Sequence, residues 1–241
     1  MEVRTLPDAH AVALEAADAI AAVVHDKPDA VLALPTGNTP IAAYAELQRR
    51  VDAGALDLSR ATVWAIDEFA GATRATPGTN SVFYRTHLRI PLRALHIPNP
   101  SAQEPEQHIA AFAGAIRRAG GLDLCVLGVG ANGHIAFNEP PSAADAPARV
   151  VTLAPSSREA HARSFGGLER VPTRAMTLGV ADLVAARRIL VLATGAHKAA
   201  IVRRAIEDPP TADVPASWLQ QHPDCTWLLS AHAATELRTH G

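Results

Sequence analysis

Residues 128–140 hold the side chains best suited to acid–base chemistry. This segment places His134 among three glycines, with Asn132 just before it and Glu139 shortly after it. Histidine is the side chain that gains or loses a proton near neutral pH, and the amide and the carboxylate are placed to orient it. Glycines let a backbone pass close to a bound molecule. The pattern predicts a catalytic histidine, with a purely structural histidine as the alternative.

The same segment contains the glycine spacing of a dinucleotide-binding turn, Gly128-x-Gly130-x-x-Gly133, after an apolar run. In such a turn the helix continues for several turns beyond the third glycine. Here Pro140 and Pro141 would stop it at once. No acidic residue ends a following strand at the expected distance either. The sequence therefore argues against a dinucleotide site.

Two adjacent carboxylates follow the apolar run 62–66. Asp67 and Glu68 would lie at the C-terminal end of a buried strand, where α/β sheets expose their ligand sites. We expect one of these side chains to turn inward while the other faces solvent. The inward carboxylate should have a raised pKa, because burial disfavours its charged form. That property suits a general base, and a surface acidic turn is the alternative.

Residues 34–40, Leu-Pro-Thr-Gly-Asn-Thr-Pro, leave one apolar run and enter a helical pattern. We expect Thr39 to cap the helix and Pro40 to occupy its first position, where a missing N–H is not needed. Gly37 lets the backbone turn tightly, so that free N–H groups and two hydroxyls converge on one point. This predicts an anion cradle, with an ordinary capped helix start as the alternative.

A second strand-to-helix junction, residues 193–198, places Lys198 near a helix start. A lysine there opposes the helix dipole, which is understandable if it meets an anion; a solvated surface lysine is the alternative. No metal site is predicted, because the histidines are dispersed and Cys125 and Cys225 lack zinc spacing. The sequence also has no Gly-x-Ser-x-Gly nucleophile elbow.

Composition excludes several classes of partner. Only 4% of the 241 residues are aromatic and the formal net charge is −2, which argues against a base-stacking or basic nucleic-acid surface. No apolar run approaches the roughly 18 residues of a membrane helix. The N-terminus reads as an amphipathic helix, not a signal peptide, and two cysteines fit a reducing compartment. We expect a cytoplasmic protein that binds neither nucleic acid nor membrane.

Short apolar runs alternate with segments in which apolar residues recur every three or four positions. The runs predict strands at 30–34, 62–66, 122–127, 149–153, 189–193 and 226–229, and the periodic segments predict helices at 41–51, 107–119, 157–163 and 198–206. Strands that are apolar without alternation are covered on both faces, as in parallel sheets. We predict one α/β domain over residues 1–241, a three-layer sandwich with a mostly parallel sheet flanked by helices.

In their order along the chain, these motifs resemble those of the glucosamine-6-phosphate deaminase family, which shares a fold with 6-phosphogluconolactonases. Residues 34–40 are similar to the family's phosphate loop, 66–69 to its Asp-Glu-Tyr/Phe element and 128–140 to its Gly-His-Ile-x-Phe-Asn-Glu-Pro signature. Residues 171–179 also fit. Lactonases of this fold usually carry Pro-Asp-Gly-His-Thr without Asn-Glu-Pro, so the resemblance favours the deaminase branch.

The resemblance implies a role for each candidate residue. Asp67 would move a proton during enolisation at C2 of the sugar, and His134, oriented by Glu139 and Asn132, would open the pyranose ring. The substrate and its phosphate would be bound by Thr36, Gly37, Asn38, Thr39, Arg163 and Lys198. The implied reaction of amino-sugar metabolism converts glucosamine 6-phosphate to fructose 6-phosphate and ammonia. It needs only proton transfers, so neither a cofactor nor a metal is expected.

The sequence departs from the family pattern in ways that leave alternatives open. Asn132 stands where many relatives have an acid, so we expect Glu139 alone to set the charge on His134. Arg149 matches an effector-site position of the allosteric hexameric members, but Val151 stands where a lysine is found, and the chain ends without their longer tail. We expect a non-allosteric monomer or small homo-oligomer. Galactosamine-6-phosphate deaminase, 6-phosphogluconolactonase and a non-catalytic sugar-phosphate-binding protein remain alternatives.

Overall fold

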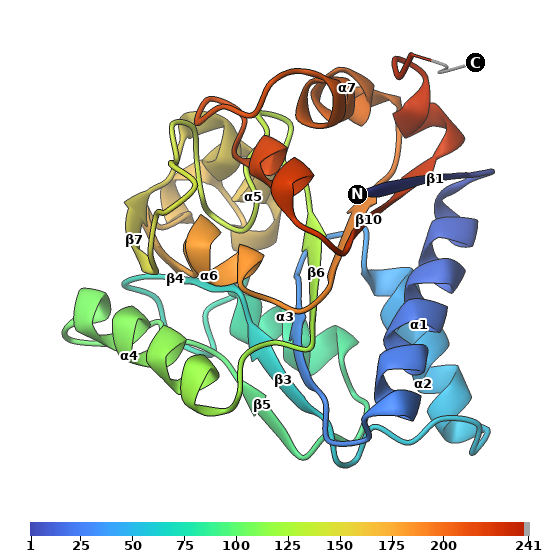
Figure 1. Ribbon diagram of the computed structural model, residues 1–241. Helices are drawn as coiled ribbons and strands as arrows, with labels where there is room; N and C mark the ends of the chain where they lie inside the picture. The colour runs from blue at the N-terminus through green and yellow to red at the C-terminus, as the bar shows by residue number, and fades with distance from the viewer. Residues whose placement is uncertain (239–241) are drawn as a thin grey trace.

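A parallel sheet runs through the centre of the molecule (Figure 1). The computed structural model describes residues 1–238. Neighbouring strands are parallel throughout, in the order β1-β10-β9-β6-β2-β3-β5. The strands are β1 (Glu2–Leu6), β2 (Val31–Leu34), β3 (Thr62–Ala65), β5 (Ala94–His96), β6 (Leu124–Gly128), β9 (Ile189–Ala193) and β10 (Cys225–Ser230). The predicted α/β architecture is confirmed.

Helices cover both faces of this sheet. They are α1 (Ala9–Asp26), α2 (Ile41–Asp52), α3 (Asn80–His87), α4 (Pro105–Arg118), α5 (Pro155–Phe165), α6 (Val180–Val184) and α7 (Ala199–Glu207), with short 3₁₀ turns η1 (Leu168–Arg170), η2 (Ala196–Lys198), η3 (Pro215–Gln221) and η4 (Ala231–Ala234). Among residues 1–238, every helix is too short or too polar to cross a membrane.

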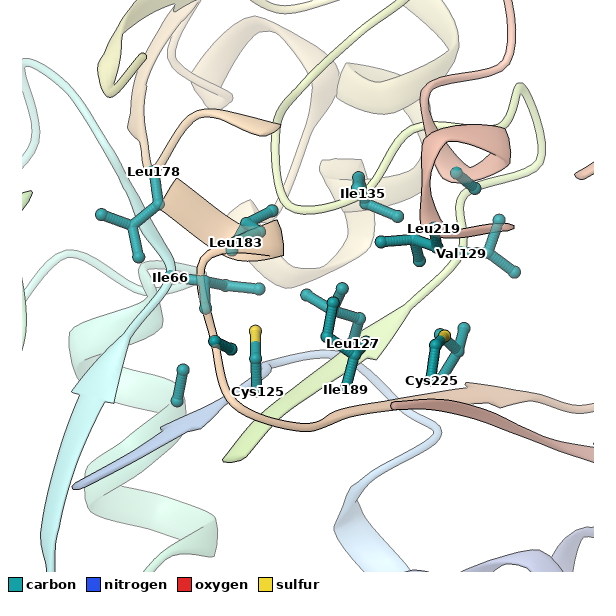
Figure 2. Packing of buried hydrophobic residues seen from close by; sticks show 14 of the residues in the cluster. Ile66, Cys125, Leu127, Val129, Ile135, Leu178, Leu183, Ile189, Leu219 and Cys225 are labelled. Atoms are coloured by element: carbon teal, nitrogen blue, oxygen red, sulfur yellow. The ribbon is translucent and has the colours of Figure 1, made fainter. Parts of the chain in front are cut away.

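Side chains of the central strands alternate between two separate cores. In β9, Leu190 and Leu192 pack with α1, α2 and α3, while Ile189 and Val191 pack with α4, α6 and α7. Figure 2 shows the second of these cores, where Leu183 and Leu219 approach the strand residues from above. This double burial explains why the central strands are apolar at every position.

A second, antiparallel sheet lies beside the first, in the order β4-β8-β7. It consists of β4 (Asp67–Phe69), β8 (Arg174–Thr177) and β7 (Arg149–Thr152). The strand predicted at 149–153 therefore exists, but it does not join the parallel sheet. A third, smaller core of Phe69, Phe137, Leu153, Phe165, Val171 and Ala175 packs this sheet against α5.

Two sequence expectations were wrong locally. The N-terminus was expected to be helical, but β1 precedes α1, whose first turn is capped by the Asp8 carboxylate accepting from the Ala11 N–H at 2.8 Å. As an edge strand, β1 is largely exposed and has no apolar run that would reveal it. The loop expected from 68 to 80 begins with β4 and ends where α3 starts.

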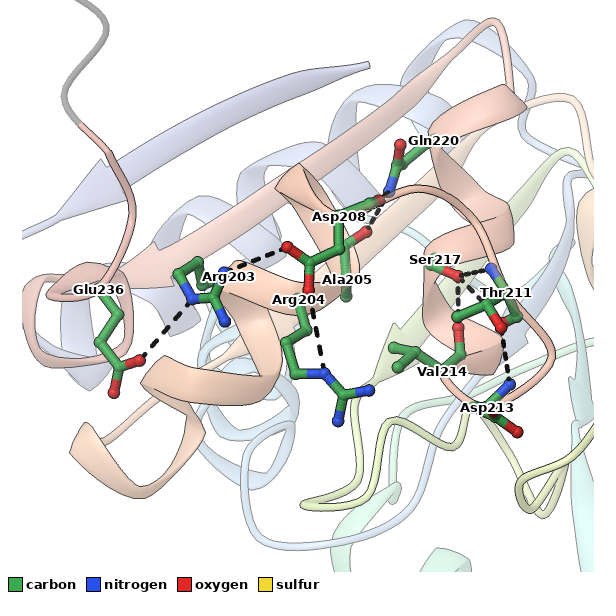
Figure 3. A network of polar contacts seen from close by, with 10 residues as sticks. All are labelled: Arg203, Arg204, Ala205, Asp208, Thr211, Asp213, Val214, Ser217, Gln220 and Glu236. Carbon is green, nitrogen blue, oxygen red and sulfur yellow. Dashed lines mark hydrogen bonds and ion pairs between the residues drawn. The ribbon is translucent and has the colours of Figure 1, made fainter.

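The segment between α7 and η3 is fixed by the polar contacts of Figure 3. The Ser217 hydroxyl donates to the Val214 carbonyl at 2.6 Å and accepts from the Thr211 N–H at 2.9 Å. The Gln220 amide donates to the carbonyls of Ala205 and Asp208. These contacts hold residues 211–217 in place beneath the glycine-rich segment that follows β6.

Candidate active site

The carboxyl ends of β2, β3, β6 and β9 border one cavity of about 680 Å³. Loops after these four strands supply most of its wall, and α5 closes one side. Eight of the predicted site residues line it: Thr36, Gly37, Asn38, Thr39, Asp67, Asn132, His134 and Lys198. Parallel strands present their carboxyl ends at one edge, which brings residues more than 150 positions apart in sequence into one wall.

The loop after β2 has the turn that the anion cradle needs. Gly37 has a φ of 102°, a left-handed conformation that favours glycine. The buried hydroxyl of Tyr44 donates to the Pro35 carbonyl at 2.6 Å, and that of Tyr84 donates to the Leu34 carbonyl. Both tyrosines lie under the loop and hold its backbone, so the cradle is preorganised by residues outside the motif.

The predicted helix cap at Thr39 is wrong. α2 begins at Ile41, and Pro40 precedes it in a helical conformation with no side-chain cap bond. The turn already starts at Asn38, whose carbonyl accepts from the Ile41 N–H at 3.4 Å. Because the loop tightens into a turn before the helix, the Thr39 hydroxyl is not used as a cap.

Asp67 is buried at the cavity wall, with 6% of its surface exposed. Burial and the neighbouring Glu68 raise its pKa to about 8, while a hydrogen bond from the Asn80 amide at 2.6 Å lowers it. Asn80 in turn accepts from the Thr36 hydroxyl at 3.0 Å, which connects Asp67 to the cradle. A carboxylate with a pKa near the working pH is suited to take up and return a proton.

Glu68 does not face solvent, contrary to expectation, and is completely buried. Its carboxylate accepts from the N–H groups of Phe69, Asn80 and Ser81 and from the Ser81 hydroxyl, at 2.7 to 3.0 Å. Two of these donors are the first N–H groups of α3, where a negative charge is favourable. Burial nevertheless raises the pKa of Glu68 above its usual range. Both acids can be buried because α3 supplies the donors.

Three side chains form a relay around His134. The Asn132 amide donates to Glu139 Oε2 at 2.8 Å, and Asn132 Oδ1 lies 2.7 Å from His134 Nδ1. Glu139 itself is 3.5 Å from that nitrogen. An ionised carboxylate only accepts hydrogen bonds, so Glu139 fixes the orientation of the amide. Asn132 Oδ1 then accepts the Nδ1 proton, which leaves His134 Nε2 free to accept a proton.

Glu139 is ionised in this arrangement. Burial alone would raise its pKa, but His134, Ser157 and Asn132 outweigh that effect and lower it to about 2. The expectation that Glu139 alone acts on His134 is therefore corrected: Asn132 makes the shorter contact and passes on the influence of the carboxylate. Glu139 does not line the cavity but lies behind this pair, where the Ala154 N–H at the start of α5 also reaches it at 3.4 Å.

Close packing explains two glycines of the segment. A methyl group on Gly130 would overlap the imidazole of His134, although the backbone there is ordinary. Gly133 has a φ of 89°, and a methyl group on it would lie 2.9 Å from Val214. The Ala216 N–H donates to the Gly133 carbonyl at 2.9 Å, which ties the segment to η3.

The two predicted cations differ in position. Lys198 lies at the start of α7 and lines the cavity, and burial lowers its pKa. Arg163 is exposed on α5 and is not among the residues that line the cavity. The structure thus unites Lys198 with the cradle and leaves Arg163 outside; its phosphate role stays a prediction from the resemblance.

The sequence did not single out two residues that belong to this site. Asn80 bonds Asp67, and the signal for it is the Thr-Asn-Ser run that opens α3, where Thr79 accepts from the Val82 N–H. His161 lines the cavity from α5. Its position on a predicted helix was known, but which face of that helix turns inward was not.

Comparison with known proteins places the chain. The family model of glucosamine-6-phosphate isomerases/6-phosphogluconolactonase matches residues 7–227. A glucosamine-6-phosphate deaminase of Rhodopirellula baltica is 38% identical over 241 residues, 98% of this chain and 96% of that protein. One from an Arthrobacter species is 39% identical over 242 residues, 99% and 93% of the two chains.

Solved structures agree with this assignment. A protein described as a monomeric glucosamine-6-phosphate deaminase has a TM-score of 0.94 at 33% identity, covering 98% of this chain and all of its own. A 6-phosphogluconolactonase from Shewanella baltica has a TM-score of 0.75 at 18% identity, with 96% and 98% coverage, and shares the fold alone. The chain therefore belongs to the family of glucosamine-6-phosphate isomerases and 6-phosphogluconolactonases.

Proposed function

We propose that this protein is a glucosamine-6-phosphate deaminase, which converts glucosamine 6-phosphate and water to fructose 6-phosphate and ammonia. The observation that carries the proposal is the buried Asp67 carboxylate, with a pKa of about 8, in one cavity with the cradle and the His134 relay. The deaminases that it resembles cover nearly the whole chain. We assign the activity to a single domain spanning residues 1–241.

The cradle and Lys198 bind the phosphate, and this contact sets the position of the sugar. Residues 36–39 offer backbone N–H groups and hydroxyls, and Lys198 adds a positive charge on the facing strand end. A charged hydrogen bond of this kind contributes about 1.5–3 kcal/mol to binding. Arg163 remains a candidate for a further phosphate contact.

Ring opening is the first chemical step. The free Nε2 of His134 accepts the proton of the C1 hydroxyl, the bond between C1 and the ring oxygen breaks, and that oxygen gains a proton. Asn132 and Glu139 hold the imidazole in the tautomer that leaves Nε2 unprotonated. The resulting imidazolium is stabilised by the ionised Glu139 behind it.

Isomerisation follows on the open chain. The Asp67 carboxylate takes the proton from C2, and a proton returns to C1, which converts the C1 aldehyde to an alcohol and the C2 amine to an imine. Water adds to C2 and ammonia leaves, giving the ketose. One carbon is reduced as its neighbour is oxidised, so the equation balances without an external electron carrier.

A coupled ammonia assay tests the proposal. We expect ammonia and fructose 6-phosphate in equal amounts from glucosamine 6-phosphate. Asp67→Asn keeps the size of the side chain and should lower kcat by about 10²–10⁴-fold, the contribution of a positioned base. Acid release from 6-phosphogluconolactone without ammonia would instead identify a lactonase, and faster turnover of galactosamine 6-phosphate would identify the epimeric deaminase.

We also propose that the protein acts as a monomer without allosteric control, in the cytoplasm. A structure that it resembles is described as a monomeric deaminase, and Val151 replaces the lysine of the effector site. The two cysteines, Cys125 and Cys225, are buried and free, which suits a reducing compartment. Sedimentation should give one species of 25.3 kDa. Sigmoidal kinetics relieved by N-acetylglucosamine 6-phosphate would contradict this.

A further inference from the structure

The proposed reaction leaves one titratable side chain of the cavity without a task. His161 lies near the middle of α5 and lines the cavity together with Ala160 and Phe137. It is half-buried, whereas Arg163, two positions further along the same helix, is exposed. Residues two positions apart on a helix point to nearly opposite sides. Of these two cationic candidates on α5, His161 faces the cavity.

Two aromatic rings hold the imidazole in place. The ring centroid of His161 lies 5.1 Å from that of Phe69 and 5.9 Å from that of Phe137, both in edge-to-face geometry. Within residues 1–238, the ring nitrogens form no hydrogen bond with protein atoms, yet they are not sealed away from solvent. The ring is therefore fixed by its apolar contacts while its polar atoms stay available to a ligand.

α5 is anchored so that this placement is defined. At its start, the Ala154 N–H approaches Glu139 Oε1 at 3.4 Å. At its end, Phe165 packs on Phe69 with centroids 4.8 Å apart. His161 lies between these anchors. The helix thus positions His161 against both the His134 relay and the strand that carries the base.

The strand geometry places His161 near Asp67. Asp67 and Phe69 are alternate residues of β4, so their side chains leave the same face of the strand, about 6.6 Å apart along it. Because His161 packs on Phe69, it flanks the region over Asp67 where C2 of the sugar must lie. It approaches this region from α5, across from the loops that form the cradle.

The charges around His161 favour a neutral partner over the phosphate. Burial and His134 lower the pKa of His161, and Glu139 partly opposes them. A neutral imidazole offers one donor and one acceptor, which matches a hydroxyl group. The ionised Glu139 nearby repels a phosphate, whereas the cradle and Lys198 attract one.

We propose that His161 binds a hydroxyl group of the sugar through a ring nitrogen and so orients the open-chain substrate over Asp67. This inference rests on the proposed function, in which the substrate is an amino-sugar 6-phosphate. His161 contributes to recognition of the sugar, and the cradle to recognition of the phosphate. It is thus a substrate-contacting residue in addition to Asp67 and His134.

Three substitutions separate hydrogen bonding from packing. His161→Phe keeps an aromatic ring against Phe69 and Phe137 but removes both nitrogens. His161→Asn and His161→Gln restore a donor and an acceptor, at the positions of Nδ1 and Nε2 respectively. We expect His161→Phe to raise KM for glucosamine 6-phosphate roughly three- to tenfold, the effect of losing one neutral hydrogen bond. One of the two amide variants should recover most of this loss.

Inorganic phosphate provides the second readout. As a competitive inhibitor it probes the cradle alone, so its inhibition constant should not change in His161→Phe. The exposed His25 of α1 gives a matched control, because His25→Phe should change neither constant. A wild-type KM in His161→Phe would overturn the inference. So would an equal loss of phosphate and sugar-phosphate affinity, which would indicate a displaced α5.

The dissociation constant of fructose 6-phosphate, measured by calorimetry, makes the result independent of turnover. His161→Phe should weaken it by the same factor as KM. If the wild-type protein binds this ketose but releases no ammonia from the amino sugar, the deaminase function fails and the contact of His161 is still tested. If ammonia is released and His161→Phe binds the ketose normally, only the role of His161 fails.

Discussion

The Asn80 side-chain amide donates one hydrogen bond of 2.6 Å to Asp67 Oδ1 and another of 3.0 Å to the Asp67 backbone carbonyl. The first bond favours the carboxylate form. It acts against burial and Glu68, which together raise the pKa of Asp67 to about 8. Since Asn80 also accepts from Thr36, the base and the cradle share one hydrogen-bonded chain.

Removing this bond should move the pH dependence of the reaction. In Asn80→Ala the carboxylate loses its donor, so the pKa of Asp67 rises further. The base form then appears at higher pH, and the acidic limb of the kcat/KM profile should shift to the alkaline side. Ser81→Ala is the control, because Ser81 bonds Glu68 and leaves the Asn80 contact intact. An unshifted profile in Asn80→Ala would remove Asn80 from the site.

The raised pKa of Asp67 also makes the stability of the protein depend on pH. The unfolded carboxyl has its ordinary pKa of 3.8, and the folded one about 8. Between these values the folded chain keeps a proton that the unfolded chain has lost, so the free energy of unfolding falls as pH rises. The contribution is fully present below the lower pKa and is lost as pH passes through the upper one.

Asp67→Asn cannot ionise and should escape this loss. The difference in melting temperature between the variant and the wild-type protein is expected to change in favour of the variant from pH 5 to pH 8. Thermal unfolding at several pH values measures it directly. Parallel curves for the two proteins would show that Asp67 titrates normally in the folded state.

Glu139→Gln tests the relay around His134. A glutamine amide both donates and accepts, so it no longer forces Asn132 to present its oxygen to His134. The imidazole loses its fixed tautomer, and kcat should fall roughly 10²-fold, the lower end of what a positioned acid–base group contributes. Because the relay runs through the amide, Asn132→Ala should cost as much. Full activity in Asn132→Ala would show that Glu139 acts on His134 directly.

Gly130→Ala tests the packing of His134. The added methyl group would overlap the imidazole, while the backbone of Gly130 accepts alanine without strain. We expect kcat to fall by about 10²-fold as the imidazole is displaced and the melting temperature to change little. A double-mutant cycle isolates the cause: in a His134→Ala background, where there is no ring to displace, Gly130→Ala should have no further effect on kcat.

Lys198→Met should weaken substrate binding, because methionine keeps the apolar stem but removes the charge. The loss of a charged hydrogen bond is expected to cost about 1.5–3 kcal/mol, which corresponds to a KM roughly 10- to 100-fold higher. Lys198→Arg keeps the charge and should lose less. If Lys198→Met changed kcat and left KM and the affinity for inorganic phosphate unchanged, Lys198 would not bind phosphate.

Much of the fold could be predicted because its signals are local. β9 matches its predicted range, and α2 and α5 extend the predicted ranges by one or two residues at an end. Burial on both faces makes a central strand apolar at every position, which is readable without knowing its neighbours. The antiparallel sheet was not recognised, because its pairing joins Asp67 to Thr177 across more than 100 residues. Strands of three or four residues leave too short a pattern to identify them.

The sequence by itself determined which residue types stand at the strand ends, and so named the cradle, Asp67, His134 and Lys198. Only the tertiary structure decided how these groups behave. Glu68 is buried because α3, whose start lies 12 residues later, points its first N–H groups at the carboxylate. His161 and not Arg163 faces the cavity because the packing of Phe69 and Phe137 sets the rotation of α5. Burial, pKa and the inward face of a helix depend on contacts between distant segments, which no local pattern records.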